Sequence, residues 1–203
     1  MGIRTVLAVA LVAAAVGGCA TTASNTLPQA KRDALRIDSV DMAYAPDAFL
    51  SWPDAMGEFV RSGAPDTPAA RRAFVEQKAA GHLRAALAAE IPPAFRGTEP
   101  ARLRVTIRRL EVASAVQRVL IGGGYALKAD IQLVDVKSGQ TLLQVADFNG
   151  YVQGGGGPLQ VVVEQMFPDP IDRVSRAFAS ALRAWLQSGQ AFASGAPGAQ
   201  FGH

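Results

Sequence analysis

Few residues of this 203-residue chain have side chains suited to catalysis or metal binding. The sequence contains two histidines, His82 and His203, and a single cysteine, Cys19, so a zinc site is not expected. His82 is the only plausible general base, and it precedes Leu83 on the flank of an expected helix, where a surface histidine is the simpler interpretation. No serine stands in a Gly-x-Ser-x-Gly sequence, so a hydrolase-type nucleophile is not indicated.

Three pairs of aspartates have a spacing that general acid–base catalysis could use. Each pair also has a simpler expected role: an exposed strand edge, strand-and-turn chemistry, and helix capping. In that order, the pairs are Asp38 with Asp41, Asp130 with Asp135, and Asp169 with Asp172. The sequence therefore predicts no catalytic residue, no metal site and no cofactor.

Two runs of glycine, residues 122–124 and 154–157, are the other candidates for ligand binding, because backbone amides of glycine loops can cradle phosphate. Neither run is followed by the Gly-Lys-Ser/Thr of a P-loop, and the first precedes an expected strand instead of a helix. We interpret them as a hairpin and a linker.

A row of arginines is the one constellation with a rationale for binding. Arg102, Arg104 and Arg108 are separated by even numbers of residues on an expected strand. Alternate side chains of a strand point the same way about 7 Å apart, so these arginines can bind phosphate or carboxylate oxygens. A solvated sheet face is the simpler alternative. A third possibility is that the arginines are neutralised by acids of the same chain, because residues 33–66 carry seven acids and two bases, whereas residues 96–118 carry six arginines and two glutamates.

The elements that position these residues are indicated by hydrophobic periodicity and by turn and cap residues. Residues 45–66 are either a short helix, Asp54 to Arg61, or a loop, and residues 159–167 are ambiguous between strand and helix. A change of phase at Arg108-Arg109 predicts a β-bulge. The expected elements are a strand over 35–44, a helix over 68–91, strands over 101–112, 125–133 and 141–151, and a helix from Asp169-Pro170 to Gly189.

This β-α-β-β-β-α order predicts an α+β fold. Strands and helices that are apolar on one side bury each other as a two-layer sandwich. We expect an antiparallel sheet of about four strands with two amphipathic helices on one face, and the arginine row on the other, wet face.

The amino terminus predicts export. Arg4 precedes an apolar run, Val6 to Val16, that would span about 16 Å as a helix, too short for about 30 Å of hydrocarbon. The sequence Val16-Gly17-Gly18-Cys19 resembles the lipobox of bacterial lipoproteins, which implies cleavage before Cys19 and lipidation of its sulfur. Ordinary cleavage after Ala23 is the alternative. The expected organisation is a signal peptide over 1–18, a lipidated tether over 19–34, one domain over 35–187 and a flexible tail over 188–203.

The element order behind this motif resembles the small envelope lipoproteins that assist other complexes, among them the LptE-like lipoproteins and the auxiliary lipoproteins of lipid-transport ABC systems. More closely, GGGYALKADIQLVDVKSGQTLLQV, with its Asp135 and Ser138-Gly139 turn, is similar to bacterial lipoproteins that carry a domain of unknown function. The similarity extends over roughly residues 100–187. It implies a fold and a location, and carries over no catalytic residue.

We therefore expect a non-enzymatic, lipid-anchored periplasmic domain that binds or scaffolds an envelope protein complex. Ala20, in place of an aspartate, resembles lipoproteins sorted to the outer membrane. The alternative is a lipid- or lipopolysaccharide-handling role for the arginine face, with an anionic lipid as ligand; an enzyme with unrecognised chemistry is the third class. A net charge of +3 does not indicate nucleic acid.

Overall fold

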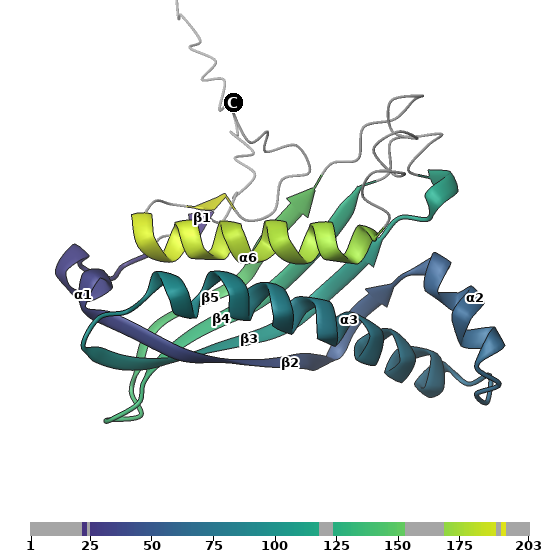
Figure 1. Ribbon diagram of the computed structural model, residues 1–203, viewed down its shortest axis with the longest axis horizontal. Coiled ribbons are helices and arrows are strands. Elements are labelled where there is room, and N and C mark those ends of the chain that lie inside the picture. Colours follow the sequence, from purple (N-terminus) through teal and green to yellow (C-terminus); the bar gives the residue numbers. More distant parts are fainter. Residues whose placement is uncertain (1–21, 24, 118–123, 153–168, 190–191, 194–203) are drawn as a thin grey trace, which may run out of the picture.

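The protein folds as a four-stranded sheet covered on one face by two helices (Figure 1). The structure is a computed structural model, and it describes residues 22–23, 25–117, 124–152, 169–189 and 192–193. Its strands are β2 (Leu35–Ser51), β3 (Glu99–Val112), β4 (Tyr125–Asp135) and β5 (Thr141–Val152), in the order β2-β3-β4-β5. The covering helices are α3 (Pro68–Glu90), against β2, and α6 (Pro170–Ser188), against β4 and β5. The expected two-layer α+β sandwich is thereby confirmed.

One feature of the sheet differs from the expected antiparallel arrangement. β3, β4 and β5 are antiparallel neighbours, but β2 pairs with β3 in parallel. The chain leaves β2 through α2 (Pro53–Arg61) and returns along α3, so it enters β3 at the end where β2 began. A crossover of this kind produces a parallel pair, whereas the short links farther along the chain produce antiparallel ones.

The strand irregularities follow from local sequence. The register between β3 and β4 shifts between Ile107 and Arg109, which confirms the expected bulge and keeps Ile107 and Leu110 both buried. β2 is longer than expected and is irregular between Tyr44 and Phe49, around Pro46, which has no amide hydrogen to donate. The segment left open between helix and loop contains α2.

Both covering helices begin at a side-chain cap and a proline. The Thr67 side chain accepts a hydrogen bond from the amide of Ala70 at the start of α3, and Asp169 accepts one from Ile171 at the start of α6. Gly189 ends α6 in the left-handed conformation, at φ 68°. These ends agree with the expected ones.

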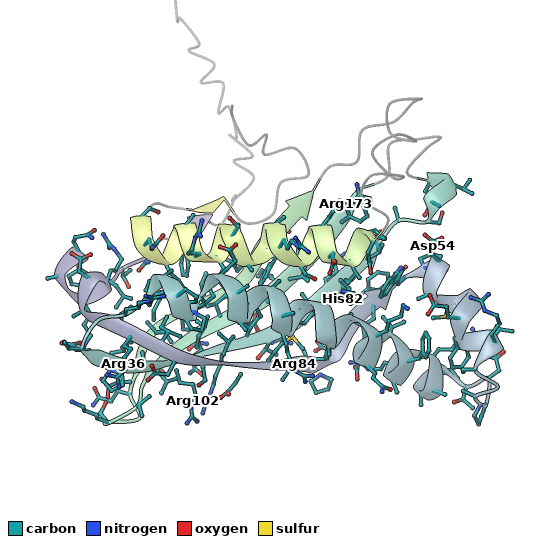
Figure 2. The ribbon with its side chains drawn as sticks, viewed as in Figure 1. Arg36, Asp54, His82, Arg84, Arg102 and Arg173 are labelled. Carbon is teal, nitrogen blue, oxygen red and sulfur yellow. The ribbon has the colours of Figure 1, made fainter. Side chains whose placement is uncertain are left out.

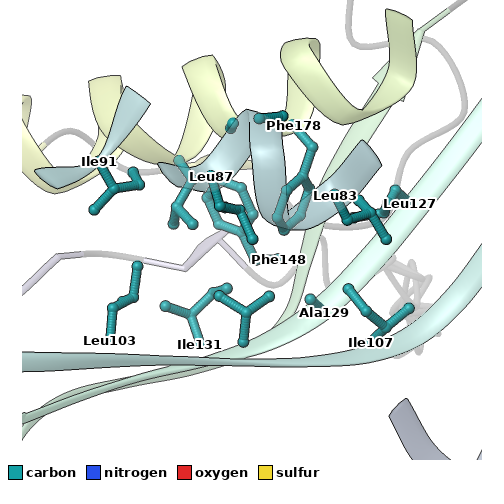
Figure 3. Packing of buried hydrophobic residues seen from close by; sticks show 14 of the residues in the cluster. Leu83, Leu87, Ile91, Leu103, Ile107, Leu127, Ala129, Ile131, Phe148 and Phe178 are labelled. Atoms are coloured by element: carbon teal, nitrogen blue, oxygen red, sulfur yellow. The ribbon is translucent and has the colours of Figure 1, made fainter. Parts of the chain in front are cut away.

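The core lies between the sheet and the two helices (Figure 3). Leu83 and Leu87 of α3 and Phe178 of α6 are fully buried against Leu103, Ile107 and Ile131 of the strands. The Phe178 ring meets Phe148 edge-on, with the centroids 5.6 Å apart. With no second cysteine available for a disulfide, this packing supplies most of the stability.

The folded domain begins before residue 35. α1 (Gln29–Ala34) and the residues from Asn25 onward pack on the domain, with Leu27 only 7% exposed, so this part of the tether expected over 19–34 is ordered against the core. A short pair, β1 (Thr22–Ala23) with β6 (Phe192–Ala193), joins the two ends of the described chain. The 3-10 helix η1 (Pro92–Ala94) links α3 to β3.

Candidate functional site

The arginine row lies on the open face of the sheet. Arg102, Arg104 and Arg108 are exposed on β3, and the residues between them, Leu103, Val105 and Ile107, are buried under the helices. Figure 2 shows Arg102 on the side of the sheet away from α3 and α6. The three side chains differ, however, in what they contact.

Arg108 is held by two carboxylates. Its Nε donates to Asp130 Oδ2 at 2.7 Å and its Nη1 donates to Asp47 Oδ1 at 3.0 Å. The hydrogen bond that Arg108 donates to Asp130 and the negative charges of both aspartates raise the pKa of Arg108. Asp130 also accepts the amide of Asp147 on β5 at 3.1 Å. Arg108 therefore ties β2, β3 and β4 together and is already engaged within the fold.

Arg102 and Arg104 are less engaged. Arg102 Nε lies 3.7 Å from Asp41 Oδ2, and Arg104 Nη1 makes a long contact of 3.5 Å with Gln132 Oε1. Among the described residues, no carboxylate forms an ion pair with Arg104. Both arginines line a hollow of about 200 Å³ at the β4–β5 hairpin end of the face, together with Gln132, Asp135 and Thr141. The hollow can hold a carboxylate or phosphate group between two guanidinium groups.

The charge asymmetry of the sequence is partly internal. Asp41 and Asp47 belong to the acidic segment 33–66 and meet Arg102 and Arg108 of the basic strand. The parallel pairing of β2 with β3 brings these charges together. Of the three arginines in the row, Arg104 is the one that forms no ion pair with a carboxylate of the described residues.

His82, labelled in Figure 2, contacts two acids that lie about 90 residues farther along the sequence. Its Nδ1 lies 2.6 Å from Asp172 Oδ1, and its Nε2 lies 3.7 Å from Asp169 Oδ2. Ligand atoms of the three side chains lie within 4.8 Å of one another, as a cation site requires. Asp169 caps α6 and Asp172 lies in its first turn, where the helix dipole favours acids. The cluster is explained as a clamp between α3 and α6.

The other aspartate pairs also have structural partners. Asp38 pairs with Arg36 at 3.0 Å on the exposed face of β2. Asp135 Oδ1 accepts hydrogen bonds from the amides of Lys137 and Ser138, and the bond from the Ser138 amide is the main reason that the pKa of Asp135 is lowered. These contacts match the strand-and-turn roles expected for them.

Two features were missed by reasoning from the sequence. The first is an apolar hollow of about 550 Å³ where β2 runs into α2, lined by Phe49, Leu50, Trp52, Met56, Arg71 and Val75. Phe49 is 51% exposed and carries the Arg109 guanidinium 4.8 Å above its ring. The second is the docked N-terminal arm. Neither has a sequence signal, because both depend on elements meeting in three dimensions.

Some candidate residues lie outside the described part of the chain: Cys19, His203, Gly122, Gly123 and Gly154 to Gly157. The ambiguous segment 159–167 lies there as well. Within the described residues, no helix is both long enough and apolar enough to cross a membrane.

Comparison with known proteins gives no family. No family model and no curated protein matches the chain. Among solved structures, a candidate lipoprotein from Caulobacter crescentus CB15 is 13% identical, covering 79% of this chain and 92% of that one, with a TM-score of 0.33. A single-substitution variant of the PelC dodecamer and the PelC dodecamer itself, both from Paraburkholderia phytofirmans, are 19% and 18% identical, covering 72% and 77% of this chain and 91% and 94% of theirs, with TM-scores of 0.26 and 0.27. Similarity at this level carries no functional inference, so the site has to be interpreted from its own residues.

Proposed function

We propose that this chain is a lipid-anchored, non-enzymatic protein of the bacterial outer membrane whose open sheet face binds an acidic surface of an envelope protein partner. The observation that carries the proposal is Arg104, an exposed guanidinium beside Arg102 in a polar hollow and without a carboxylate partner among the described residues. A carboxylate from a partner would complete this site with charge-assisted hydrogen bonds. Arg108 stabilises this face of the sheet, but its guanidinium is paired with Asp47 and Asp130 and so is not available to a partner.

The anchor in this proposal comes from the sequence. Cys19 follows an apolar export segment and two glycines, as lipidation requires, and Ala20 favours the outer membrane over retention at the inner one. The absence of enzymatic activity is part of the proposal, supported by the structural tasks that the described acid pairs and His82 already perform.

Binding of an amphiphile is the second candidate, and the apolar hollow at Phe49 is the observation that favours it. A lipid would need its headgroup and its chain to bind at adjoining sites. The register places Phe49 opposite Arg109, five residues along β3 from Arg104, or about 17 Å. The arginine hollow and the apolar hollow are thus separate, and a protein partner fits the arginine face better.

In-cell crosslinking of the anchored protein tests the proposal. A photoreactive residue in place of Gln144, exposed on the open face of β5, should capture an envelope protein. Arg104→Glu should abolish this crosslink, and Arg176→Glu on the exposed side of α6 should preserve it. A crosslink to lipid alone would favour the amphiphile, and a protein crosslink that survives Arg104→Glu would refute the role of Arg104.

A second measurement tests the anchor independently. Intact-mass analysis of the mature protein should show a chain beginning at Cys19 with several acyl chains, and Cys19→Ser should lose them. An unmodified chain beginning at Ser24 would refute the lipid anchor while leaving the partner surface to be tested by crosslinking.

A further inference from the structure

The outer edge of β2 is covered at both ends and open in between. β2 stands at one end of the strand order, and among the described strands it pairs only with β3. Residues 95–97 cover the start of this edge, where the Ile37 amide donates to the Phe95 carbonyl at 3.1 Å. Arg72 covers the far end, where it donates to the Ala45 carbonyl at 2.8 Å. Between these contacts, no described residue bonds to the outer edge over residues 38–44, which we call the β2 window.

The backbone groups that face the β2 window belong to its apolar residues. Residues of one strand whose side chains share a face also point their amides and carbonyls to the same edge. Ile37, whose amide points outward, has its side chain buried under the helices. Val40, Met42 and Tyr44 lie on the same face, because they pair with buried residues of β3 and pack against the core. Their amides and carbonyls therefore point to the open edge, which is a template for a further strand.

We propose that the β2 window pairs with itself: β2 of a second copy of this chain adds in antiparallel register about Met42, so that the two sheets become one. Met42 then faces Met42 of the second copy, and Val40 faces Tyr44 in both directions. All of these are hydrogen-bonded pairs that exchange two bonds each, or about six bonds in total. The facing apolar side chains add to this stabilisation.

The charges of β2 favour this register over its neighbours. With the two-fold axis at Met42, Asp41 lies opposite Ala43 of the second copy, so no like charges face each other directly. An axis at Asp41 would set two carboxylates opposite each other, which is destabilising, and would leave fewer hydrogen-bonded pairs. A slip by one residue would set apolar side chains of one copy against the wet face of the other.

The flank of α3 beside the β2 window leaves room for the second copy. Burial raises the pKa of Tyr44 and the charge of Arg84 opposes that rise, so Arg84 lies on the β2 side of α3 (Figure 2). Gly81 and Ala88 lie one turn away on either side of Arg84 and are exposed as well. A Cβ at Gly81 would meet nothing within 4 Å. A flank of such small residues lets a second helix approach to the usual 8–10 Å between axes.

The pairing goes beyond the proposed partner surface and does not depend on it. A two-fold axis perpendicular to the sheet keeps the helices of both copies on one side and both open faces on the other. Arg102 and Arg104 of the two copies would then face the same direction. The pair would thus present two arginine hollows to one partner surface.

Disulfide formation between two different variants tests the register. Both variants are full chains with Cys19→Ser, so the introduced cysteine is the only thiol. Asp41→Cys and Ala43→Cys, both exposed on the open face, occupy a pair without mutual hydrogen bonds, where Cα atoms lie about 4.5 Å apart, within the range of a disulfide. The control mixture is Ser39→Cys with Ala43→Cys, which are diagonal neighbours about 7–8 Å apart in this register.

With oxidised glutathione, we expect the mixture of Asp41→Cys and Ala43→Cys to form the disulfide between the two variants, and the control mixture to form at least fivefold less. Equal yields from the two mixtures, a higher yield from the control, or no disulfide in either would overturn the proposal.

Sedimentation of the Cys19→Ser chain tests the edge by a separate route. The parent should sediment with twice the mass of one chain. Met42→Lys should sediment as a single chain, because two ammonium groups would face each other across the axis, whereas in one chain the partly buried position lets the lysine reach water. Val145→Lys, at a partly buried position of β5 on the opposite edge, is the matched control and should keep the paired mass.

A parent that sediments as a single chain would overturn the proposal, and so would a Met42→Lys variant that keeps both its circular dichroism spectrum and the paired mass. If Met42→Lys does not fold, the two cysteine mixtures decide the question.

Discussion

Replacing Asn25 with alanine should destabilise the domain by about 2 kcal/mol, although the residue lies ten positions before the first strand of the main sheet. Its side chain makes three hydrogen bonds: two to carbonyls at the end of α6 and one from the amide of Leu27 at 3.1 Å. A typical bond contributes about 1 kcal/mol net, which sets an upper limit of about 3 kcal/mol. The carbonyl of Trp185 also accepts the amide of Gly189, so part of the loss is compensated.

The aspartate variant sharpens this prediction. Asn25→Asp keeps the oxygen that accepts the Leu27 amide but loses the two N–H donors. It also places a negative charge beside the carbonyls of a helix C-terminus, an unfavourable position worth up to about 1 kcal/mol more. We therefore expect Asn25→Asp to be less stable than Asn25→Ala, even though it is closer in shape to the native residue.

Urea denaturation followed by circular dichroism measures both variants, with Thr26→Ala as the control. Thr26 is the exposed neighbour, and its replacement should change the free energy of unfolding by less than about 0.5 kcal/mol. A loss below about 0.5 kcal/mol for Asn25→Ala, or a more stable Asn25→Asp, would show that the arm is not docked on α6.

Three further predictions concern the core, a close contact and pH. Phe178→Ala should cost about 3–5 kcal/mol in denaturant, because this fully buried ring packs on Phe148 and its loss leaves a cavity; Val60→Ala, at a side chain 75% exposed, is the matched control. Gly97→Ala should cost about 2 kcal/mol or more, since a Cβ there would overlap the backbone at the end of α1, and a neutral result would contradict that close approach. Burial raises the pKa of Tyr44 to about 12 from 10.0, so the folded state keeps a proton that the unfolded state releases and stability should fall as pH rises from about 10 to 12. Tyr44→Phe should show less of this alkaline loss in denaturation midpoints, and an unchanged pH profile would contradict the assignment.

Local chemistry made much of the fold predictable. Thr67-Pro68 and Asp169-Pro170 start helices wherever an amphipathic sequence follows, and the Asp135 to Gly139 turn is built from its own side chains and a glycine at φ 71°. Even the bulge at Arg108 is visible in the sequence, because a one-residue slip would otherwise turn Leu110 outward. These features depend on neighbours within a few residues.

The position of the candidate site could be predicted from the sequence, but the contacts of its arginines could not. Period-two alternation put Arg102, Arg104 and Arg108 on one face of one strand, and the structure places them there. Which of them lacks a carboxylate partner among the described residues depended on the parallel pairing of β2 with β3, which brings Asp41 and Asp47 to the row. No spacing rule links residues 60 positions apart, so the distinction between Arg108 and Arg104 needed the tertiary structure.

The sequence by itself determined the composition of the core, the caps and turns, the face of the arginines and the resemblance to a lipobox at Cys19, because each is encoded in short-range spacing. Only the tertiary structure decided the direction of β2, the clamp between His82 and the start of α6, and the docking of Asn25 on the end of α6. Those contacts join segments up to about 160 residues apart. They arise where packed elements meet in three dimensions, so no local pattern in the sequence encodes them.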